Sequence, residues 1–302
     1  MRSTILAVVP LILLLSACGE SSNASERLRV MVTNDDGFSA PGIAAMVDKL
    51  VSNASLDVKV FAPETNSSGS GDTISTDTVV TVRQTTTASG YPATAVRKTA
   101  ADSSLFGILE GLTEKPDLVV SGVNDGQNIG EVVYGPGLVN SGTVGAAIWA
   151  ARFGIPAIAV SQGSQSTSFA EPANYVAELV ERFRTDAAFR QLMQSGNAPG
   201  RALVLNVNFP TCKTGTTRGV RVVPLGRSVN PVRYSLQSDD GTKQTYMLET
   251  TTSSLFASDC TSALSGPTTD IEAMNNGFAS VTPLGTDATL AGDLGRFKSL
   301  ER

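Results

Sequence analysis

The sequence predicts an α/β fold: a Rossmann-like three-layer core with a mostly parallel sheet, plus a C-terminal β-hairpin extension. Short apolar runs alternate with longer segments whose apolar residues recur at helical spacing. Most of the short runs are continuously apolar, which is typical of parallel strands covered on both faces. The chain has 302 residues, 41% hydrophobic and 17% charged, so it can bury a full core.

The first predicted unit is β-α-β. Residues 28–33, LRVMVT, form an apolar strand. A helix is expected to begin at Pro41, because proline suits the first helical turn. Its apolar face consists of Ile43, Met46, Val47 and Leu50. Residues 57–62 form the second strand, and the polar loop PETNSSGSGD follows it.

The same alternation continues along the chain. Apolar runs at 116–122, 155–161 and 202–208 are predicted to be strands. Segments 141–154 and 171–195 lie between them and show helical spacing. Together these elements complete the α/β core.

The C-terminal third changes in composition. Residues 217–255 are rich in Val, Arg, Thr and Tyr, and Asp240 with Gly241 gives a hairpin-turn signal. We therefore expect a β-hairpin extension here. A late helix at 269–277 and a final strand at 278–284 follow.

The N-terminus resembles a lipoprotein export signal. Residues 1–17 hold one Arg and an apolar run too short to span a bilayer durably. LSAC, which ends at Cys18, resembles a lipobox, in which cleavage leaves the Cys lipidated. We expect an exported, membrane-anchored protein facing the periplasm or cell exterior, with the lipidated Cys18 and a flexible tether at 18–27, the main domain at 28–290 and a polar tail at 291–302. A plain signal peptide, or a glycosylated fungal secreted protein, is the alternative.

Two further cysteines, Cys212 and Cys260, remain when Cys18 is set aside. An even number in an exported chain favours a disulfide. Two free thiols are the alternative, because the sequence does not give the distance between them. The two cysteines flank the predicted hairpin segment, so a bridge is expected to staple that extension.

Composition excludes several classes of site and partner. The chain has no histidine, which excludes a Ser-His-Asp triad, a phosphohistidine intermediate and a His-ligated zinc centre. The formal net charge is −5 and the 23 Lys and Arg residues are scattered, so no nucleic-acid polymer is expected as a partner. The chemistry must use carboxylates, hydroxyls and amides.

Polar loops leave the carboxyl ends of the predicted strands, where open α/β sheets bind ligands. In the first of these loops, NDDG places Asp35 beside Asp36, and the two carboxylates repel each other unless a cation neutralises them. Carboxylate, amide and hydroxyl oxygens are the ligands that magnesium and manganese prefer. The sequence therefore predicts one divalent metal cation, magnesium or manganese. The other loops at this edge are 63–75 and 122–140.

Features suited to a phosphate lie in the same region. The glycines of SGVNDGQNIG let the backbone approach a ligand closely. Ser141, Gly142 and Thr143 open the helix at 141–154, and a helix N-terminus attracts anions. A metal beside a phosphate suggests phosphoester hydrolysis.

Six sequence blocks resemble the successive motifs of the SurE family of metal-dependent nucleotidases or acid phosphatases. They are VTNDDGFSAPGI, FAPETNSSGSG, PDLVVSGVNDGQNIG, NSGTVGAAIWAARFGIPAIAVS, LNVNFP and GFASVTPLGTDAT. The resemblance covers residues 28 to about 290 and keeps the family's order. It implies hydrolysis of nucleoside 5′- or 3′-monophosphates and a homodimer or tetramer.

The resemblance also implies roles for individual residues. The divalent cation would be held by Asp35, Asp36, Ser68 and Asn124. Asp35 and Asp36 would also be the catalytic residues. Supporting or phosphate and substrate contacts would come from Asn34, Asn128, Ser141, Gly142 and Thr143.

The implied mechanism is metal-assisted in-line attack by water, with Asp35 or Asp36 orienting or deprotonating it. A covalent aspartyl-phosphate is the rival mechanism, although phosphatases that use one place two Asp one residue apart. The alternative functions are a ligand-binding exported lipoprotein without turnover and a broad-specificity acid phosphatase.

The chain departs from the family pattern in two places. Residues 99–103 read TAADS where the family usually has Thr-Pro-Ala-Asp-Cys, and the loop before Ser141 carries an extra GPGLVN. We therefore expect the rim of the site to differ from that of relatives. Most members of the family lack a signal and act in the cytoplasm, so the predicted export sets this chain apart.

Overall fold

The computed structural model describes residues 27–130, 133–135, 138–139, 141–196, 198–226, 233–249, 258–287 and 292–302. The predicted signal peptide at 1–17, and Cys18 with the tether as far as residue 26, lie outside these residues. None of the helices in the described part is long and apolar enough to cross a membrane.

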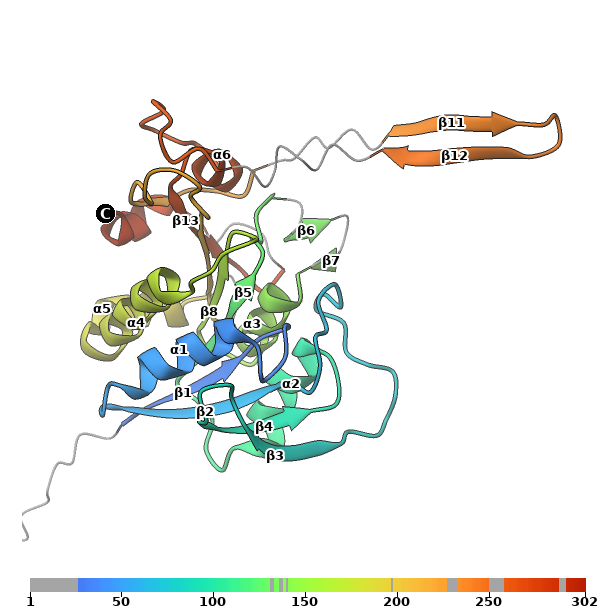
Figure 1. Cartoon of the computed structure of the whole chain (residues 1–302). Helices are drawn as coiled ribbons and strands as arrows, with labels where there is room; N and C mark the ends of the chain where they lie inside the picture. Colours follow the sequence, from blue (N-terminus) through green and yellow to red (C-terminus); the bar gives the residue numbers. More distant parts are fainter. Residues whose placement is uncertain are drawn as a thin grey trace, which may run out of the picture.

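Nine of the described strands form one sheet in the order β10-β13-β9-β8-β5-β1-β2-β4-β3 (Figure 1). Neighbouring strands are parallel except for the pairs β13–β9 and β3–β4. Their bounds are β1 Leu28–Thr33, β2 Leu56–Pro63, β3 Val82–Thr86, β4 Pro92–Val96, β5 Leu118–Asp125, β8 Ala157–Gln162, β9 Val204–Phe209, β10 Val220–Val222 and β13 Ala279–Leu284.

Helices cover both faces of this sheet. Val30 and Val32 of β1 pack in the same cluster as the helices of one face, while Met31 packs in the cluster of the other face. Alternate residues of one buried strand thus serve two apolar layers. The first layer holds α1 (Pro41–Val51), α4 (Ala170–Thr185), α5 (Ala187–Gln194) and the 3₁₀ helix η4 (Leu294–Leu300). The second holds α2 (Ala100–Phe106), the π-helical turn η1 (Gly107–Gly111) and α3 (Gly142–Arg152).

The predicted three-layer α/β fold is therefore confirmed, and so is the hairpin extension. Strands β11 (Arg233–Asp239) and β12 (Gln244–Glu249) pair antiparallel in a sheet of their own (Figure 1). Two short strands, β6 (Tyr134–Gly135) and β7 (Leu138–Val139), form another small pair. Helix α6 (Asp270–Asn275) precedes β13.

Several elements differ from the prediction. The expected helix at 171–195 is two helices, because Asp186 ends α4 and caps α5 by accepting the N–H groups of Ala188 and Phe189. Strand β10, inside the expected hairpin segment, joins the main sheet instead. The expected polar tail at 291–302 includes η4, whose Phe297 is fully buried in the first apolar layer. Apolar residues at helical spacing in this short segment make it part of the core.

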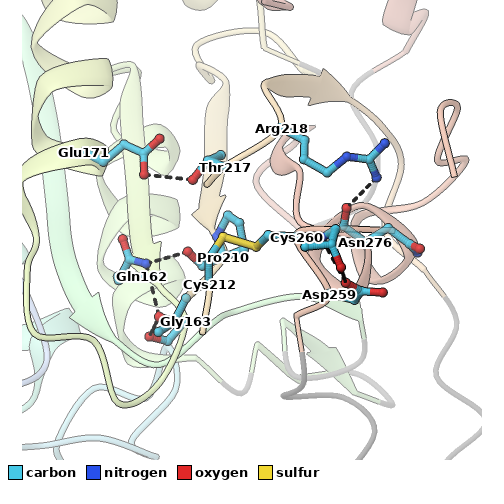
Figure 2. The surroundings of a disulfide bond; sticks show 12 residues. Gln162, Gly163, Glu171, Pro210, Cys212, Thr217, Arg218, Asp259, Cys260 and Asn276 are labelled. Carbon is cyan, nitrogen blue, oxygen red and sulfur yellow. Dashed lines mark hydrogen bonds between the residues drawn. A yellow bond between two sulfur atoms is a disulfide. The ribbon is translucent and has the colours of Figure 1, made fainter. Parts of the chain in front are cut away.

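The two cysteines form a disulfide, as the sequence favoured, with Cα atoms 5.7 Å apart. The bridge joins the segment that follows β9 to the segment that precedes α6 (Figure 2). The contacts of this region are with the main domain, since Arg218 donates to Asn276 O at 2.9 Å beside the bridge. The expectation that it staples the hairpin is therefore corrected, because it ties two loops of the main domain together.

Candidate active site

The loops that follow β1, β2 and β5 are hydrogen-bonded to one another at the carboxyl edge of the sheet. The Ser67 N–H, in the loop after β2, donates to Asp35 O at 2.7 Å. The Asp125 N–H, at the end of β5, donates to an Asp36 carboxylate oxygen at 3.1 Å. Because β2, β1 and β5 are neighbours in the sheet, the three predicted loops converge on the aspartate pair.

Asn34 shapes the turn that presents the two aspartates. Its side-chain amide donates to Gly37 O at 2.9 Å and accepts the Gly37 N–H at 3.2 Å. Gly37 has φ of 104°, a conformation that side chains disfavour. Both the oxygen and the nitrogen of the buried Asn34 amide are engaged in this turn. Of the two roles that the sequence left open, support of the site or contact with the phosphate, these bonds favour support.

Asp35 lies against the N-terminus of α3. It is 4% exposed, and Thr143 Oγ1 donates to its Oδ1 at 2.7 Å. Burial raises the pKa of Asp35, and hydrogen bonds from the side chain and backbone of Thr143 oppose that rise. The dipole at the start of α3 favours negative charge at this position. Gly142 leaves the necessary room, because a Cβ there would lie 2.8 Å from Asp35 Oδ2.

Asp36 is the more open of the two aspartates. Burial raises its pKa to about 6, and the nearby charge of Asp35 adds to the rise. Besides the Asp125 N–H, the carboxylate accepts a hydrogen bond from Asn66 Nδ2 at 3.3 Å. A hydrogen bond from the Ser68 side chain works in the opposite direction and lowers the pKa. The pair thus carries two like charges in a partly dry environment.

The other two predicted metal ligands lie beside Asp36. Ser68 is exposed, and its hydroxyl lies close enough to Asp36 to lower the pKa of that carboxyl. Asn124 is 8% exposed and precedes Asp125, whose backbone binds Asp36. The Asn124 Nδ2 donates to Gly126 O at 2.6 Å. No described residue donates to Asn124 Oδ1, so this amide oxygen is available to a ligand.

Asn128 is held by a buried polar network that the sequence did not predict. Its N–H donates to Asn208 Oδ1 at 2.7 Å, and its carbonyl accepts from Asn206 and Asn208 at 2.9 and 3.0 Å. Its Nδ2 donates to Ser161 Oγ at 2.8 Å and to Thr143 Oγ1 at 3.3 Å. A chain of hydrogen bonds therefore runs from β9 to Asp35. The signal was the pair of asparagines in the otherwise apolar strand LNVNFP.

The start of α3 carries the remaining predicted residues. Ser141 is the N-cap, and its Oγ accepts the Val144 N–H at 3.1 Å. Gly142 and Thr143 occupy the first turn, next to Asp35. The Val144 N–H at this end is taken by Ser141 Oγ and the Thr143 N–H acts on Asp35, so it is the helix dipole that favours an anion here.

Asp270 is a second group that the sequence did not predict. This fully buried carboxylate accepts the N–H groups of Gly130, Gly226 and Ile271 at 2.8, 2.6 and 2.8 Å. Burial raises its pKa to about 6, and these hydrogen bonds oppose the rise. Asp270 therefore joins the end of the Asn128 loop to α6.

The segment TAADS departs from the family pattern at Ala100 and Ser103, and it contacts the rim of the site through Thr99 and Asp102, which keep the pattern. Thr99 caps α2 and forms a reciprocal capping box with Asp102. The Asp102 carboxylate also accepts the Ser75 N–H at 3.1 Å, and Thr99 Oγ1 donates to Thr73 O at 3.0 Å. TAADS thus holds the loop that carries Ser68.

The donors of the site fit a hard divalent cation. The salt bridges found between described residues do not include Asp35 or Asp36. No described group of three or more His, Cys, Asp and Glu side chains could hold a metal. The hydroxyl of Ser68 and the free oxygen of Asn124 would therefore complete an all-oxygen set, which suits magnesium or manganese.

Comparisons with known proteins identify the family of this chain. The sequence model described as "Survival protein SurE" matches residues 30–231. Two proteins named 5′-nucleotidase SurE are similar: that of Desulfatibacillum aliphaticivorans is 35% identical over 90% of this chain and 97% of its own length, and that of Parvibaculum lavamentivorans is 36% identical over 89% of each. The crystal structure of the SurE protein from Aquifex aeolicus superposes with a TM-score of 0.67 and 30% identity, covering 86% of this chain and 94% of that one. On its sequence, its fold and its relatives, this chain belongs to the SurE family.

Proposed function

We propose that this protein is a nucleotide phosphatase that hydrolyses nucleoside 5′-monophosphates, and 3′-monophosphates as well, with a divalent metal. The observation that carries the proposal is the Asp35–Asp36 pair at the carboxyl edge of the sheet, with Asp35 buried beside the N-terminus of α3 and Asp36 partly buried next to it. The names of the relatives support a nucleotide as the substrate.

Each residue has a place in this reaction. Asp35, Asp36, Ser68 and Asn124 would hold the cation. When bound, magnesium or manganese would act as a Lewis acid on the phosphoryl group and lower the pKa of the attacking water. The positive end of the α3 dipole would attract the phosphoryl oxygens. Asp36 orients the water and accepts its proton, because it is the more open carboxylate, whereas Asp35 is enclosed and held by Thr143.

Phosphate release tests the proposal. The protein is freed of metal with a chelator, supplied with magnesium or manganese, and assayed on adenosine 5′- and 3′-monophosphate. Metal-dependent release is expected from both. Equal rates on unrelated phosphomonoesters would indicate a broad-specificity acid phosphatase. Binding without release would indicate a ligand-binding protein, and a phosphate-labelled protein would indicate an aspartyl-phosphate.

We also propose that the protein is exported and anchored through Cys18, and that it assembles as a homodimer or tetramer like the family it belongs to. The support for export is LSAC after an apolar run. Cys18→Ser should remain unprocessed and lose lipid labelling. Unchanged labelling of this variant would refute the anchor.

A further inference from the structure

A groove of about 430 Å³ lies at the carboxyl ends of β8 and β9. Its lining comes from the end of β8, the segment that leads to α4 and the segment that follows β9. The residues that matter here are Gln162, Gln165, Glu171, Thr211, Cys212 and Thr217. Volumes of about 300–1,000 Å³ are typical of small-molecule sites.

The groove adjoins the candidate active site. The Gly126 N–H, two residues after Asn124, donates to Gln162 O at 2.8 Å. The Ser164 N–H donates to Gln127 Oε1 at 3.1 Å. The loop that carries Asn124 therefore forms the border between the aspartate pair and the groove. A molecule with its phosphate at the pair can extend its other end into the groove.

Gln162 offers an unused hydrogen-bond acceptor in this groove. The residue is only 4% exposed. Its Nε2 donates to Pro210 O at 2.8 Å and to Thr211 Oγ1 at 3.2 Å. No described residue donates to its Oε1, which Figure 2 shows turned away from Pro210 and towards the side of Glu171. This oxygen reaches the surface of the groove, where a ligand or water can donate to it.

The charges of the lining indicate what kind of group would donate. Glu171 and Lys213 carry one charge of each sign, and the rest of the lining is dominated by hydroxyls and amides. Thr217 Oγ1 donates to Glu171 at 2.8 Å across the groove (Figure 2). A neutral, hydrogen-bonding surface of this kind suits hydroxyl and amino groups rather than a phosphate.

We propose that this groove binds the sugar and base of the nucleotide whose phosphate lies at Asp35 and Asp36. The Gln162 Oε1 accepts a hydrogen bond from a ribose hydroxyl or an exocyclic amino group. This inference rests on the proposed function, because it assigns the second half of that substrate.

The disulfide forms part of this binding surface. Cys212 lines the groove, and its bond to Cys260 attaches that wall to the main domain (Figure 2). The wall segment has little regular structure of its own. Thr211 gives it one further attachment, because its hydroxyl bonds to Gly163 O. The groove is therefore held in a binding shape before substrate arrives.

Two substrates that share only the phosphoryl group test the proposal. The enzyme is assayed on adenosine 5′-monophosphate and on phenyl phosphate, and adenosine is tested as a competitive inhibitor of phenyl phosphate hydrolysis. Thr167→Trp fills the groove from an exposed position, and Gln162→Met removes the acceptor. Ala88→Trp, an exposed position in the β3–β4 turn, is the control.

Gln162→Met should raise the KM for the nucleotide and the inhibition constant of adenosine roughly tenfold, the effect of one lost hydrogen bond. Thr167→Trp should raise both constants at least as much, because its side chain occupies the groove. Phenyl phosphate kinetics should stay within twofold, and Ala88→Trp should match the wild type. If Gln162→Met fails to fold, the exposed Thr167→Trp gives the answer. If Thr167→Trp leaves nucleotide hydrolysis unchanged, the proposal that the groove binds the nucleoside is refuted, whereas the proposed function still stands. If the wild type does not hydrolyse the nucleotide, the proposed function fails. Calorimetric titration of the wild type and of Thr167→Trp with adenosine then still shows whether the groove binds the nucleoside.

Discussion

Replacing Thr143 with valine should weaken both the fold and the metal site. Thr143 is fully buried, and its Oγ1 joins Asp35 at 2.7 Å to Asn128 at 3.3 Å. Valine keeps the shape and removes only the hydroxyl. Asn128 retains its bond to Ser161, so the main loss falls on the buried Asp35 carboxylate.

The size of the loss follows from these contacts. A hydrogen bond to a charged group contributes about 1.5–3 kcal/mol. At about 2 °C per kcal/mol for a chain of this size, the Tm of the metal-free protein should fall by about 3–6 °C. The hydroxyl of Thr143 orients Asp35, which is a proposed metal ligand. Without that hydroxyl, the site should bind the cation about 10–100-fold more weakly.

The pKa of Asp35 gives the direction of the pH effect. The hydrogen bond from the Thr143 side chain lowers that pKa, so its loss raises the pKa further above the usual range. Protons then compete better with the cation, and the affinity loss should be larger at pH 5.5 than at pH 7.5.

Calorimetric metal titration and thermal unfolding measure these effects, with Thr282→Val as the control. Thr282 is equally buried, but its Oγ1 donates to Val223 O at 2.9 Å, in a neutral hydrogen bond between β13 and the segment after β10. In the control, the free energy of unfolding should fall by about 0.5–1.5 kcal/mol and the metal affinity should stay unchanged. Equal metal affinity in both variants would refute the role assigned to Thr143.

Three further outcomes are expected. Asp35→Asn or Asp36→Asn should abolish phosphate release. The Tm of the metal-free variants should be unchanged or higher, because the repulsion between the two carboxylates is removed. Wild-type turnover in both variants would exclude the two aspartates from the mechanism. The pKa of Asp270, raised to about 6 from 3.8, means that the folded protein holds a proton that the unfolded chain releases, so the free energy of unfolding should fall by about 2 kcal/mol between pH 4 and 6. Asp270→Asn should remove that part of the pH dependence in urea unfolding, and an identical pH dependence in the variant would contradict this. Reduction of Cys212–Cys260 opens a 48-residue loop and should lower the free energy of unfolding by up to about 4 kcal/mol, and an unchanged Tm after verified reduction would count against it.

Strong periodic patterns made the core strands and helices predictable from sequence. β1 has the predicted bounds, and α1 begins at Pro41 as expected. Segment 82–111 was not predicted, because β3 is mostly exposed and lacks a period-2 apolar pattern. Asp186, a residue type that favours helix N-caps, marks the boundary between α4 and α5 in the sequence. The boundary was missed because the apolar spacing continues across it.

The sequence predicted which residues gather at the candidate site, but not the residues that hold them in place. Asp35 and Asp36 stand out because like charges rarely adjoin at the end of an apolar strand. Asn206 and Asn208 donate to Asn128 O, about 80 positions away in the chain, and a local sequence pattern cannot predict such a distant contact. Asp270 resembles an ordinary residue of a first helical turn, and only the fold brings Gly130 to it.

The position of β13 imposes an order on assembly. This strand lies between β9 and β10, although it follows both in the chain. A docking site on β9 must therefore stay open until a strand some 70 residues later inserts into it, and β10 can join the sheet only afterwards. The same late segment brings Asp270 to Gly130. Such non-local closure is slow. During refolding, most of the parallel sheet can therefore form while the active-site loop is still without its final anchor, so recovery of activity should trail recovery of secondary structure.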